Sequence, residues 1–318
     1  IGLVSDLNQY SPSADDATEQ KQAELKIVWK NVLSITLLHI GTAYGFYLYL
    51  TQAMWATRLY SILLSSVSAF GITAGAHRLW AHKSYKTNLP LRILLTIMQT
   101  LAMQNSVIVW ARDHRMHHKY SETDADPHNI MRGFFFAHMG WLLVRKHPAI
   151  KAKTDTLDMS DLWADPVLRF QYKYFYFLFP VIGFVIPSYI PTFWGEKFEI
   201  SFMISGVLRY VLTLHGTWLI NSAAHMWGSK PYDKNIAPVE NPALSIITHG
   251  EAFHNYHHTF PWDYKAAELG NYSANFTTFF IDRMAKIGWA YDLRTVTPEL
   301  IKKRVERTGD GTHKSHEY

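Results

Sequence analysis

Cysteine is absent from all 318 residues of the sequence. Its absence excludes disulfide bonds, thiolate nucleophiles, zinc knuckles and iron–sulfur clusters held by cysteine. The sequence also has no GxGxxG segment, no haem-binding HPGG segment and no flavin signature. Any redox reaction of this protein therefore needs electrons from a partner protein.

Charged residues are scarce, at 18 % of the sequence, whereas hydrophobic residues make up 48 % and aromatic residues 15 %. The mean hydropathy of −0.09 is nevertheless too polar for a chain that lies wholly in lipid. A bundle of spanning helices joined to a large aqueous part fits this composition better. The net charge of +5 and the isoelectric point near 9.1 suit an anionic ligand or an acidic protein partner, and we expect no nucleic acid among the partners.

Four long apolar stretches cover residues 32–50, 59–76, 175–194 and 200–226. Each is about long enough to cross a hydrocarbon core of roughly 30 Å. They predict an all-α membrane protein with four transmembrane helices, and the alternative is a soluble protein with buried helices. A fifth run, residues 91–103, is short and follows Pro90, so we expect a helix at the membrane interface or inside the aqueous part.

Lysine and arginine lie mostly outside the apolar stretches: 28 of the 31 are in residues 1–30, 77–175 and 228–318. With four spans, these three segments share one face of the membrane, and the positive-inside rule makes that face cytosolic. We expect a mobile tail over residues 1–26, one integral membrane domain over 27–310 and a C-terminal tail over 311–318. The domain's cytosolic helical cap comprises residues 77–174 and 227–310.

Nine of the 17 histidines are concentrated in three clusters and one outlier. The nine are His77, His82, His114, His117, His118, His225, His254, His257 and His258. All nine lie on the predicted cytosolic side. Neutral imidazole is the commonest metal ligand in proteins. Their number fits a site for two metal ions.

The spacings within these clusters carry geometric information. Each HxxHH motif places its histidines at i, i+3 and i+4, on one helical face. His77 and His82 are five residues apart, which on a regular α-helix separates them by roughly 140°, so we expect the helix to unwind there or one ligand to reach across. His225 follows Asn221 by one turn, so that amide could contact a metal directly or through water.

The other histidines have weaker claims to be ligands. We expect His39, His215, His313 and His316 not to bind metal, and His249 to be a decoy close to the third cluster. His128 and His138 are expected to pack beside the ligands. Four carboxylates are candidates for orienting imidazole rings through hydrogen bonds, namely Asp113, Asp124, Asp126 and Glu251.

At these motifs the sequence resembles the membrane acyl-CoA desaturases of animals, the stearoyl-CoA 9-desaturase type, and is most like the insect members. The resemblance covers about residues 25–310. It rests on GAHRLWAH (75–82), WARDHRMHHKYSETDADPHN (110–129), RGFFFAHMGWLLVRKHP (132–148), NSAAHMWGSKPYDKNI (221–236), GEAFHNYHHTFPWDY (250–264) and NFTTFFID (275–282).

The resemblance implies that the nine histidines hold two iron ions, with Asn221 holding a metal-bound water. It also implies an endoplasmic reticulum membrane protein that uses O2 as co-substrate. Its electron donor would be cytochrome b5 with an NADH-dependent reductase. Nitrogen ligands suit redox-active iron, and zinc, which binds imidazole but has no redox chemistry, is expected only as an adventitious occupant.

The resemblance further implies a set of substrate contacts. Asn105, Arg112, Asp113, Arg145 and Lys146 would meet the CoA moiety, while Gln104, Trp110, Thr217 and Trp218 would shape the bend of an acyl tunnel. Ser65 and Ala69 precede His77 by twelve and eight residues, and we expect them to set the depth of that tunnel. For Arg145 and Lys146 the alternative is contact with lipid head groups.

The sequence thus predicts insertion of a cis double bond, at the delta-9 position, into a saturated C16 or C18 fatty acyl-CoA. The alternatives are delta-11 or other regiochemistry, a membrane fatty-acid hydroxylase or alkane mono-oxygenase, a histidine-rich metal transporter, and a soluble zinc hydrolase. Two sequons, at Asn271 and Asn275, are expected to carry no glycan because both should face the cytosol.

Overall fold

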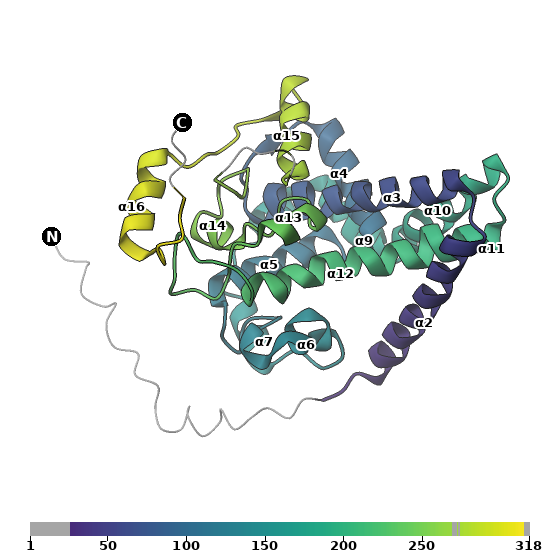
Figure 1. The fold of residues 1–318 in the computed structure, drawn as a ribbon, viewed down its shortest axis with the longest axis horizontal. Coiled ribbons are helices and arrows are strands. Elements are labelled where there is room, and N and C mark those ends of the chain that lie inside the picture. The colour runs from purple at the N-terminus through teal and green to yellow at the C-terminus, as the bar shows by residue number, and fades with distance from the viewer. Residues whose placement is uncertain (1–25, 269–271, 273, 315–318) are drawn as a thin grey trace.

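The computed structural model describes residues 26–268, 272 and 274–314, and its regular structure is almost entirely helical (Figure 1). The expected N-terminal tail lies outside the described residues apart from Lys26, as do residues 315–318 of the expected C-terminal tail. Here η marks a 3₁₀- or π-helix. In chain order the elements are α2 (Trp29–Thr51), α3 (Trp55–Phe70), η1 (Gly71–Ala81), β1 (Lys86–Thr87), α4 (Leu89–Ala102), α5 (Val107–Tyr120), η2 (Ile130–Arg132), α6 (Phe134–His138), η3 (Gly140–Leu142), α7 (Pro148–Thr154), α8 (Ser160–Ala164), α9 (Pro166–Pro180), η4 (Val181–Val185), α10 (Ile186–Tyr189), η5 (Ile190–Trp194), α11 (Phe198–Ser201), η6 (Phe202–Leu208), α12 (Arg209–Asn221), η7 (Ala223–His225), α13 (Pro242–Ile247), α14 (His254–Thr259), α15 (Phe276–Lys286), β2 (Ala290–Tyr291) and α16 (Pro298–Thr308).

Within this described part of the chain, four helical runs are long and apolar enough to cross a membrane. They are Trp29–Thr51, Trp55–Ala81, Pro166–Trp194 and Phe198–His225. The predicted fold class, an all-α membrane protein with four spans and a helical part that gathers the histidines, is confirmed. In Figure 1, α3 and α12 run along the long axis of the bundle, and α14 and α16 lie at the end opposite α11.

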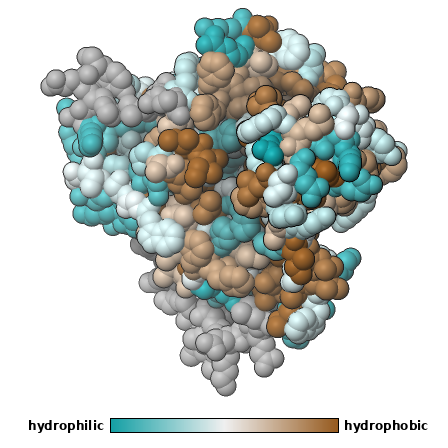
Figure 2. Space-filling model, turned by 45° about the vertical axis from the view of Figure 1, so that its right-hand side comes forward, coloured by the Kyte–Doolittle hydropathy of each residue, from teal (hydrophilic) through white to brown (hydrophobic). Residues whose placement is uncertain are grey.

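The space-filling view shows extensive hydrophobic areas on one face of the molecule (Figure 2). Broad brown areas of hydrophobic side chains surround a hollow in this face. Large hydrophobic side chains of the first two spans are exposed, among them Leu37, Ile40, Ile62 and Leu63. Lipid is the solvent that makes such a surface favourable, because exposed apolar area of this extent is rare on soluble monomers.

Helix α4 corresponds to the short fifth apolar run. The side chain of Asn88 caps it by accepting a hydrogen bond from the Leu91 N–H, and Pro90 occupies its first turn, where its missing N–H costs nothing. It packs against η1, α3 and α9 and meets α5 at an 80° bend. Length and composition would also allow α4 and α5 to form one broken span. We assign the pair to the cap because His114, His117 and His118 of α5 lie among the histidines of α14.

Arg209, the charged residue within the fourth span, is buried with 1 % of its surface exposed. Its guanidinium donates hydrogen bonds to the carbonyl oxygens of Ser205 (2.7 Å), Leu101 (3.1 Å) and Gly183 (2.8 Å). These bonds join α12 to α4 and to η4 of the third span. Backbone groups have no water to bond with in a membrane interior, so Arg209 satisfies three acceptors there.

Two glycines let helices approach closely. A Cβ atom on Gly45 of α2 would come within 2.6 Å of the Met203 carbonyl oxygen, and one on Gly71 within 2.2 Å of the Gln99 nitrogen. Small residues at such crossings are the usual means of helix packing in membranes. The two contacts hold the first span on the fourth and the start of η1 on α4.

We predict that Arg209→Leu lowers the free energy of unfolding by at least about 2 kcal/mol, because it leaves buried carbonyl groups without a donor. The thermal midpoint of the detergent-purified protein measures this change. Lys197→Met, at an exposed position outside the helices, is the control. An Arg209→Leu midpoint equal to that of the control would contradict the assigned role.

Candidate metal centre

The first histidine pair lies on an unusual helix. The sequence predicts that the helix unwinds between His77 and His82 or that one ligand reaches across, whereas the structure keeps the chain helical there as a π-helix, η1. Its i→i+5 pattern continues to the His82 N–H, which donates to the His77 carbonyl at 3.1 Å. A π-helix has more residues per turn than an α-helix, so residues five apart face the same side. The two rings are consequently 4.8 Å apart, as π-helical turns at functional sites often arrange.

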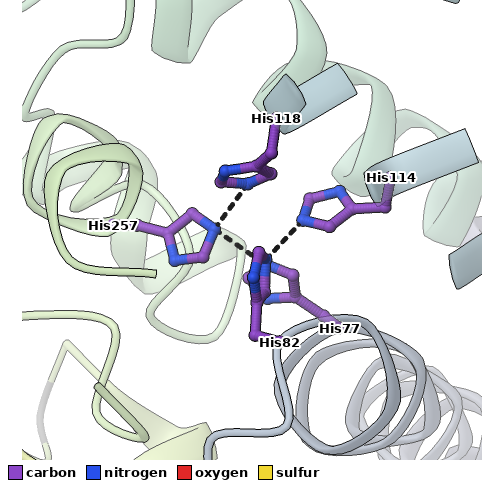
Figure 3. Close-up of side chains that lie close together, drawn as sticks. All are labelled: His77, His82, His114, His118 and His257. Carbon is purple, nitrogen blue, oxygen red and sulfur yellow. Dashed lines mark hydrogen bonds between the residues drawn. The ribbon is translucent and has the colours of Figure 1, made fainter. Parts of the chain in front are cut away.

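Five histidines form the first cluster, which we call the five-histidine cluster: His77, His82, His114, His118 and His257. One ring nitrogen of each lies within 4.8 Å of the others. Figure 3 shows the rings converging from η1, α5 and α14. The Nε2 atoms of His82 and His114 are 2.8 Å apart, and that of His257 lies 2.9 Å from His77 and 3.0 Å from His118.

The remaining four histidines form the second, four-histidine cluster: His117, His225, His254 and His258. The Nε2 atom of His254 lies 3.1 Å from those of both His225 and His258. Each HxxHH motif is therefore divided. The i and i+4 histidines of each helix belong to the same cluster, and the middle histidine, at i+3, belongs to the other cluster. Helices α5 and α14 therefore both contribute to both clusters.

The charge state of these rings suits metal binding. Burial, followed by the charge of neighbouring histidines, holds the pKa of His82, His114, His118, His254, His257 and His258 well below the ordinary value. Neutral rings present a free lone pair, which a cation needs. In neither cluster does a carboxylate stand among the converging nitrogens. The residues present thus fit two cations that prefer nitrogen donors.

Two of the four candidate carboxylates contact rings of the two clusters. An oxygen of Glu251 lies 2.7 Å from Nδ1 of His77, and one of Asp126 lies 2.9 Å from Nδ1 of His117. Burial acts to raise the pKa of Glu251, but the charges of Arg78 and His77 outweigh it and bring the pKa to about 2. The other two expectations are wrong: Asp113 pairs with Arg112 and Lys146, and Asp124 is exposed.

Arg78 is a site residue that the sequence analysis missed. It is 1 % exposed, and it donates to Glu251 Oε1 from Nε (3.0 Å) and from Nη2 (2.8 Å). Further bonds to the Tyr264 carbonyl (2.9 Å) and the Thr278 hydroxyl (3.0 Å) fix the guanidinium. An arginine directly after His77, at the end of an uncharged stretch, was the available signal.

Two cavities meet at the histidine clusters. The inner cavity, about 640 Å³, includes Ser65, Ala69, His77 and His254 in its wall. The outer cavity, about 370 Å³, includes Gln104, Asn105, Asp113 and Trp218. Both are lined by Trp110, His114, Thr217 and Asn221. The junction of the two cavities therefore lies against a ring of the five-histidine cluster.

The residues expected to shape a bend are hydrogen-bonded to one another at this junction. The amide of Gln104 donates to the Thr217 hydroxyl at 2.8 Å, and the Trp110 indole N–H donates to the Gln104 oxygen at 3.2 Å. Asn221, at the end of α12, also faces the junction. The participants in these two bonds come from α5, α12 and the loop before α5, so tertiary structure assembles this wall.

The residues expected at a CoA moiety lie only partly together. Asp113 bonds Arg112 at 2.8 Å and Lys146 at 2.5 Å, which holds two cations beside the outer cavity. Arg145 is exposed, and its backbone N–H donates to the Lys26 carbonyl at 2.9 Å.

The other histidines lie outside both clusters. His215 links His39 (3.1 Å) and His138 (2.9 Å), which in turn contacts Ser222. His128 lies 3.5 Å from Asp126, in line with its expected place beside a ligand. His313 contacts Glu268, and His316 lies outside the described residues.

One of the two sequons can be placed. Asn275 is 1 % exposed and its side-chain oxygen accepts a bond from Arg78 at 3.2 Å, so it is inaccessible to modification in the folded protein. Asn271 lies outside the described residues.

Comparison with known proteins agrees with this architecture. The fatty acid desaturase family model matches residues 53–268. An acyl-CoA Delta-9 desaturase of Acheta domesticus is 55 % identical over 98 % of this chain and 88 % of its own length. An acyl-CoA Delta12-desaturase of the same species is 58 % identical (91 % of this chain, 81 % of its length), and an acyl-CoA Delta(11) desaturase of Spodoptera littoralis is 56 % identical (91 % and 86 %). The chain belongs to the fatty acid desaturase family, and it is therefore a membrane oxidoreductase.

We predict that Glu251→Gln weakens metal retention by about 10- to 100-fold, because ring-orienting carboxylates contribute that much to metal affinity. Competition with a chelator, followed by metal analysis, measures the loss. Asp124→Asn is the matched control, because it makes the same change at an exposed carboxylate. Equal retention in the two variants would refute the role of Glu251.

Proposed function

We propose that this protein is an acyl-CoA desaturase that inserts a cis double bond into the saturated chain of a C16 or C18 fatty acyl-CoA. The observation that carries the proposal is the junction of two cavities against the histidine clusters. A chain that runs through both cavities has its middle carbons, and neither of its ends, beside the metal ligands.

The cavities suit the two halves of such a chain. The outer cavity lies beside Arg112, Asp113 and Lys146, and cationic side chains bind phosphate and carbonyl oxygens of a CoA moiety. The inner cavity takes the methyl end and passes Ser65 and Ala69. Trp110, Gln104 and Thr217 enforce the bend that positions two adjacent methylenes, and fixed geometry of this kind accounts for much of an enzyme's rate.

The nine histidines would hold two iron ions, five nitrogens at one and four at the other, with Asn221 placed to hold a water at the four-histidine cluster. All-nitrogen ligand sets suit iron that cycles between Fe2+ and Fe3+, and zinc would occupy them only adventitiously. Bound iron would supply the redox chemistry, in which two hydrogens leave adjacent methylenes and O2, with two electrons and two protons, becomes two waters. Glu251 and Asp126 keep the His77 and His117 rings oriented.

Delta-9 is the position we propose for the double bond, in keeping with the named activity of the relative that matches 98 % of the chain. Relatives of similar identity bear Delta12 and Delta(11) names, so delta-11 or another position is the alternative. A hydroxylase sharing the same ligands would give an alcohol instead of an alkene.

We propose cytochrome b5, with its NADH-dependent reductase, as the electron donor, because this sequence has no redox-cofactor motif and a net charge of +5 that complements an acidic partner. The proposed location is the endoplasmic reticulum membrane, with both termini and the metal centre cytosolic. Residues 27–310 would form a single integral membrane domain.

Expression in a desaturase-deficient yeast, with double bonds located by mass spectrometry, tests the proposed function. We expect growth without added unsaturated fatty acid and a cis-9 alkene product. A hydroxylated product without an alkene would overturn the desaturase proposal, whereas a cis-11 alkene would overturn only the position.

Loss of single ligands tests the metal assignment. We expect His257→Ala, in the five-histidine cluster, and His117→Ala, in the four-histidine cluster, each to remove about one metal equivalent and to abolish desaturation. Mass-spectrometric metal analysis and product analysis measure the two effects. His313→Ala is the control, and full iron content or retained desaturation in either ligand variant would contradict the assignment.

A glycosylation sequon inserted between Gly195 and Glu196 tests the orientation. These residues connect the third and fourth spans, which the orientation places in the lumen, so we expect a glycan there. A sequon appended to the C terminus should stay unmodified. The reverse pattern in an endoglycosidase-treated gel would invert the orientation.

A further inference from the structure

A third cavity lies beside the inner one. This lateral cavity, about 420 Å³, is lined by Ser66, Phe70, His249, Phe276, Phe279, Phe280 and Arg283. Ser66, His249 and Phe276 also line the inner cavity. These three side chains are thus the wall that the two cavities share.

The wall is closed by one hydrogen bond between distant segments. Nε2 of His249 lies 3.2 Å from the Ser66 hydroxyl of α3. The imidazole packs edge-on against Phe70 at 5.5 Å and Phe276 at 5.9 Å. His249 belongs to neither metal cluster, so this contact needs a reason other than ligation.

The backbone of His249 is held firmly while its side chain depends on that bond. Its φ of +59° is left-handed, and its carbonyl accepts bonds from the Thr277 N–H (3.1 Å) and hydroxyl (2.8 Å). A fixed backbone that carries a ring held by one side-chain hydrogen bond and two aromatic edge contacts is the arrangement of a gate. Rotation of the ring would connect the two cavities without moving a helix.

The lateral cavity leads toward the apolar surface. Phe276 and Phe279 are 39 % and 40 % exposed, and α15 stands across the end of α3 in Figure 1. Phe70 of α3 stacks on Phe280 of α15 at 5.1 Å. The guanidinium of Arg283 lies 4.6 Å from the Phe279 ring. The cavity is therefore an aromatic space near the protein surface with a cation at its edge.

We propose that His249 and Ser66 form a gate between the inner and lateral cavities, and that this gate limits the length of acyl chain that the protein accepts. The inference rests on the proposed function, since it takes the methyl end of an acyl-CoA as the occupant of the inner cavity. With the gate closed, the methyl end stops within the inner cavity. With the gate open, a longer chain continues among the phenylalanine rings of the lateral cavity.

Binding to purified protein tests the gate without requiring turnover. The probes are palmitoyl-, stearoyl-, arachidoyl- and behenoyl-CoA, and the readout is the ligand-induced shift of the thermal midpoint as a function of concentration. We expect His249→Asn to raise the affinity for arachidoyl- and behenoyl-CoA roughly tenfold relative to palmitoyl-CoA, the scale at which apolar pockets discriminate added methylenes. Asparagine is chosen because it tolerates the left-handed backbone.

Two further variants make the test specific. Ser66→Ala removes the hydrogen bond without changing the cavity walls greatly, and we expect a shift in the same direction even if His249→Asn folds poorly. Adding Phe279→Trp to either variant narrows the lateral cavity alone and should cancel the gain. His313→Asn is the matched control, since it makes the same substitution outside the three cavities, and it should leave the length preference unchanged.

The outcomes separate the gate from the proposed function. Palmitoyl-CoA binding with an unchanged length preference in both gate variants overturns the gate and leaves the proposed function standing. A gain that survives Phe279→Trp overturns the lateral cavity as the route. If no acyl-CoA binds the unaltered protein, the acyl-CoA substrate and the gate are both overturned.

Discussion

Nine imidazoles with facing nitrogens, five of them buried and four partly buried, are the constraint on which the rest of this structure depends. Nε2 atoms 2.8 to 3.1 Å apart are stable as neighbours only if the rings stay neutral or share a cation, because two imidazolium ions at that distance repel strongly. Burial keeps the rings neutral, and the surrounding carboxylates and arginine fix their direction. The fold can be understood as a means of holding these rings in place away from water.

The helices that hold the rings also build the cavities. Helix α12 is the clearest case, since Arg209 anchors it among the other spans, Thr217 lines both cavities, and Asn221 and His225 follow at its end. A rotation of α12 would displace the bend and the four-histidine cluster together. The junction of the cavities and the four-histidine cluster are therefore coupled through one helix.

Hydrophobic length was enough to predict the four spans, because a membrane requires about 20 apolar residues of helix regardless of what packs around it. Histidine number and spacing were enough to predict that the nine rings converge and that they fit two metal ions. Spacing did not predict the π-helix at Gly71–Ala81, because the α-helical period was assumed for residues five apart. It also did not separate the histidines into five and four, since the middle histidine of each HxxHH motif, at i+3, joins the cluster that holds the other two histidines of the opposite motif.

The sequence by itself therefore determined the all-α membrane class and the set of nine converging histidines, because these follow from composition and local period. Tertiary structure decided which carboxylates serve the rings, since Glu251 reaches His77 across 174 residues while Asp113 turns to Lys146. It also decided the role of Arg78. The inner and outer cavities meet at Trp110, and the inner and lateral cavities meet at His249. Such features arise from side chains far apart in the chain, whose contacts no local periodicity encodes.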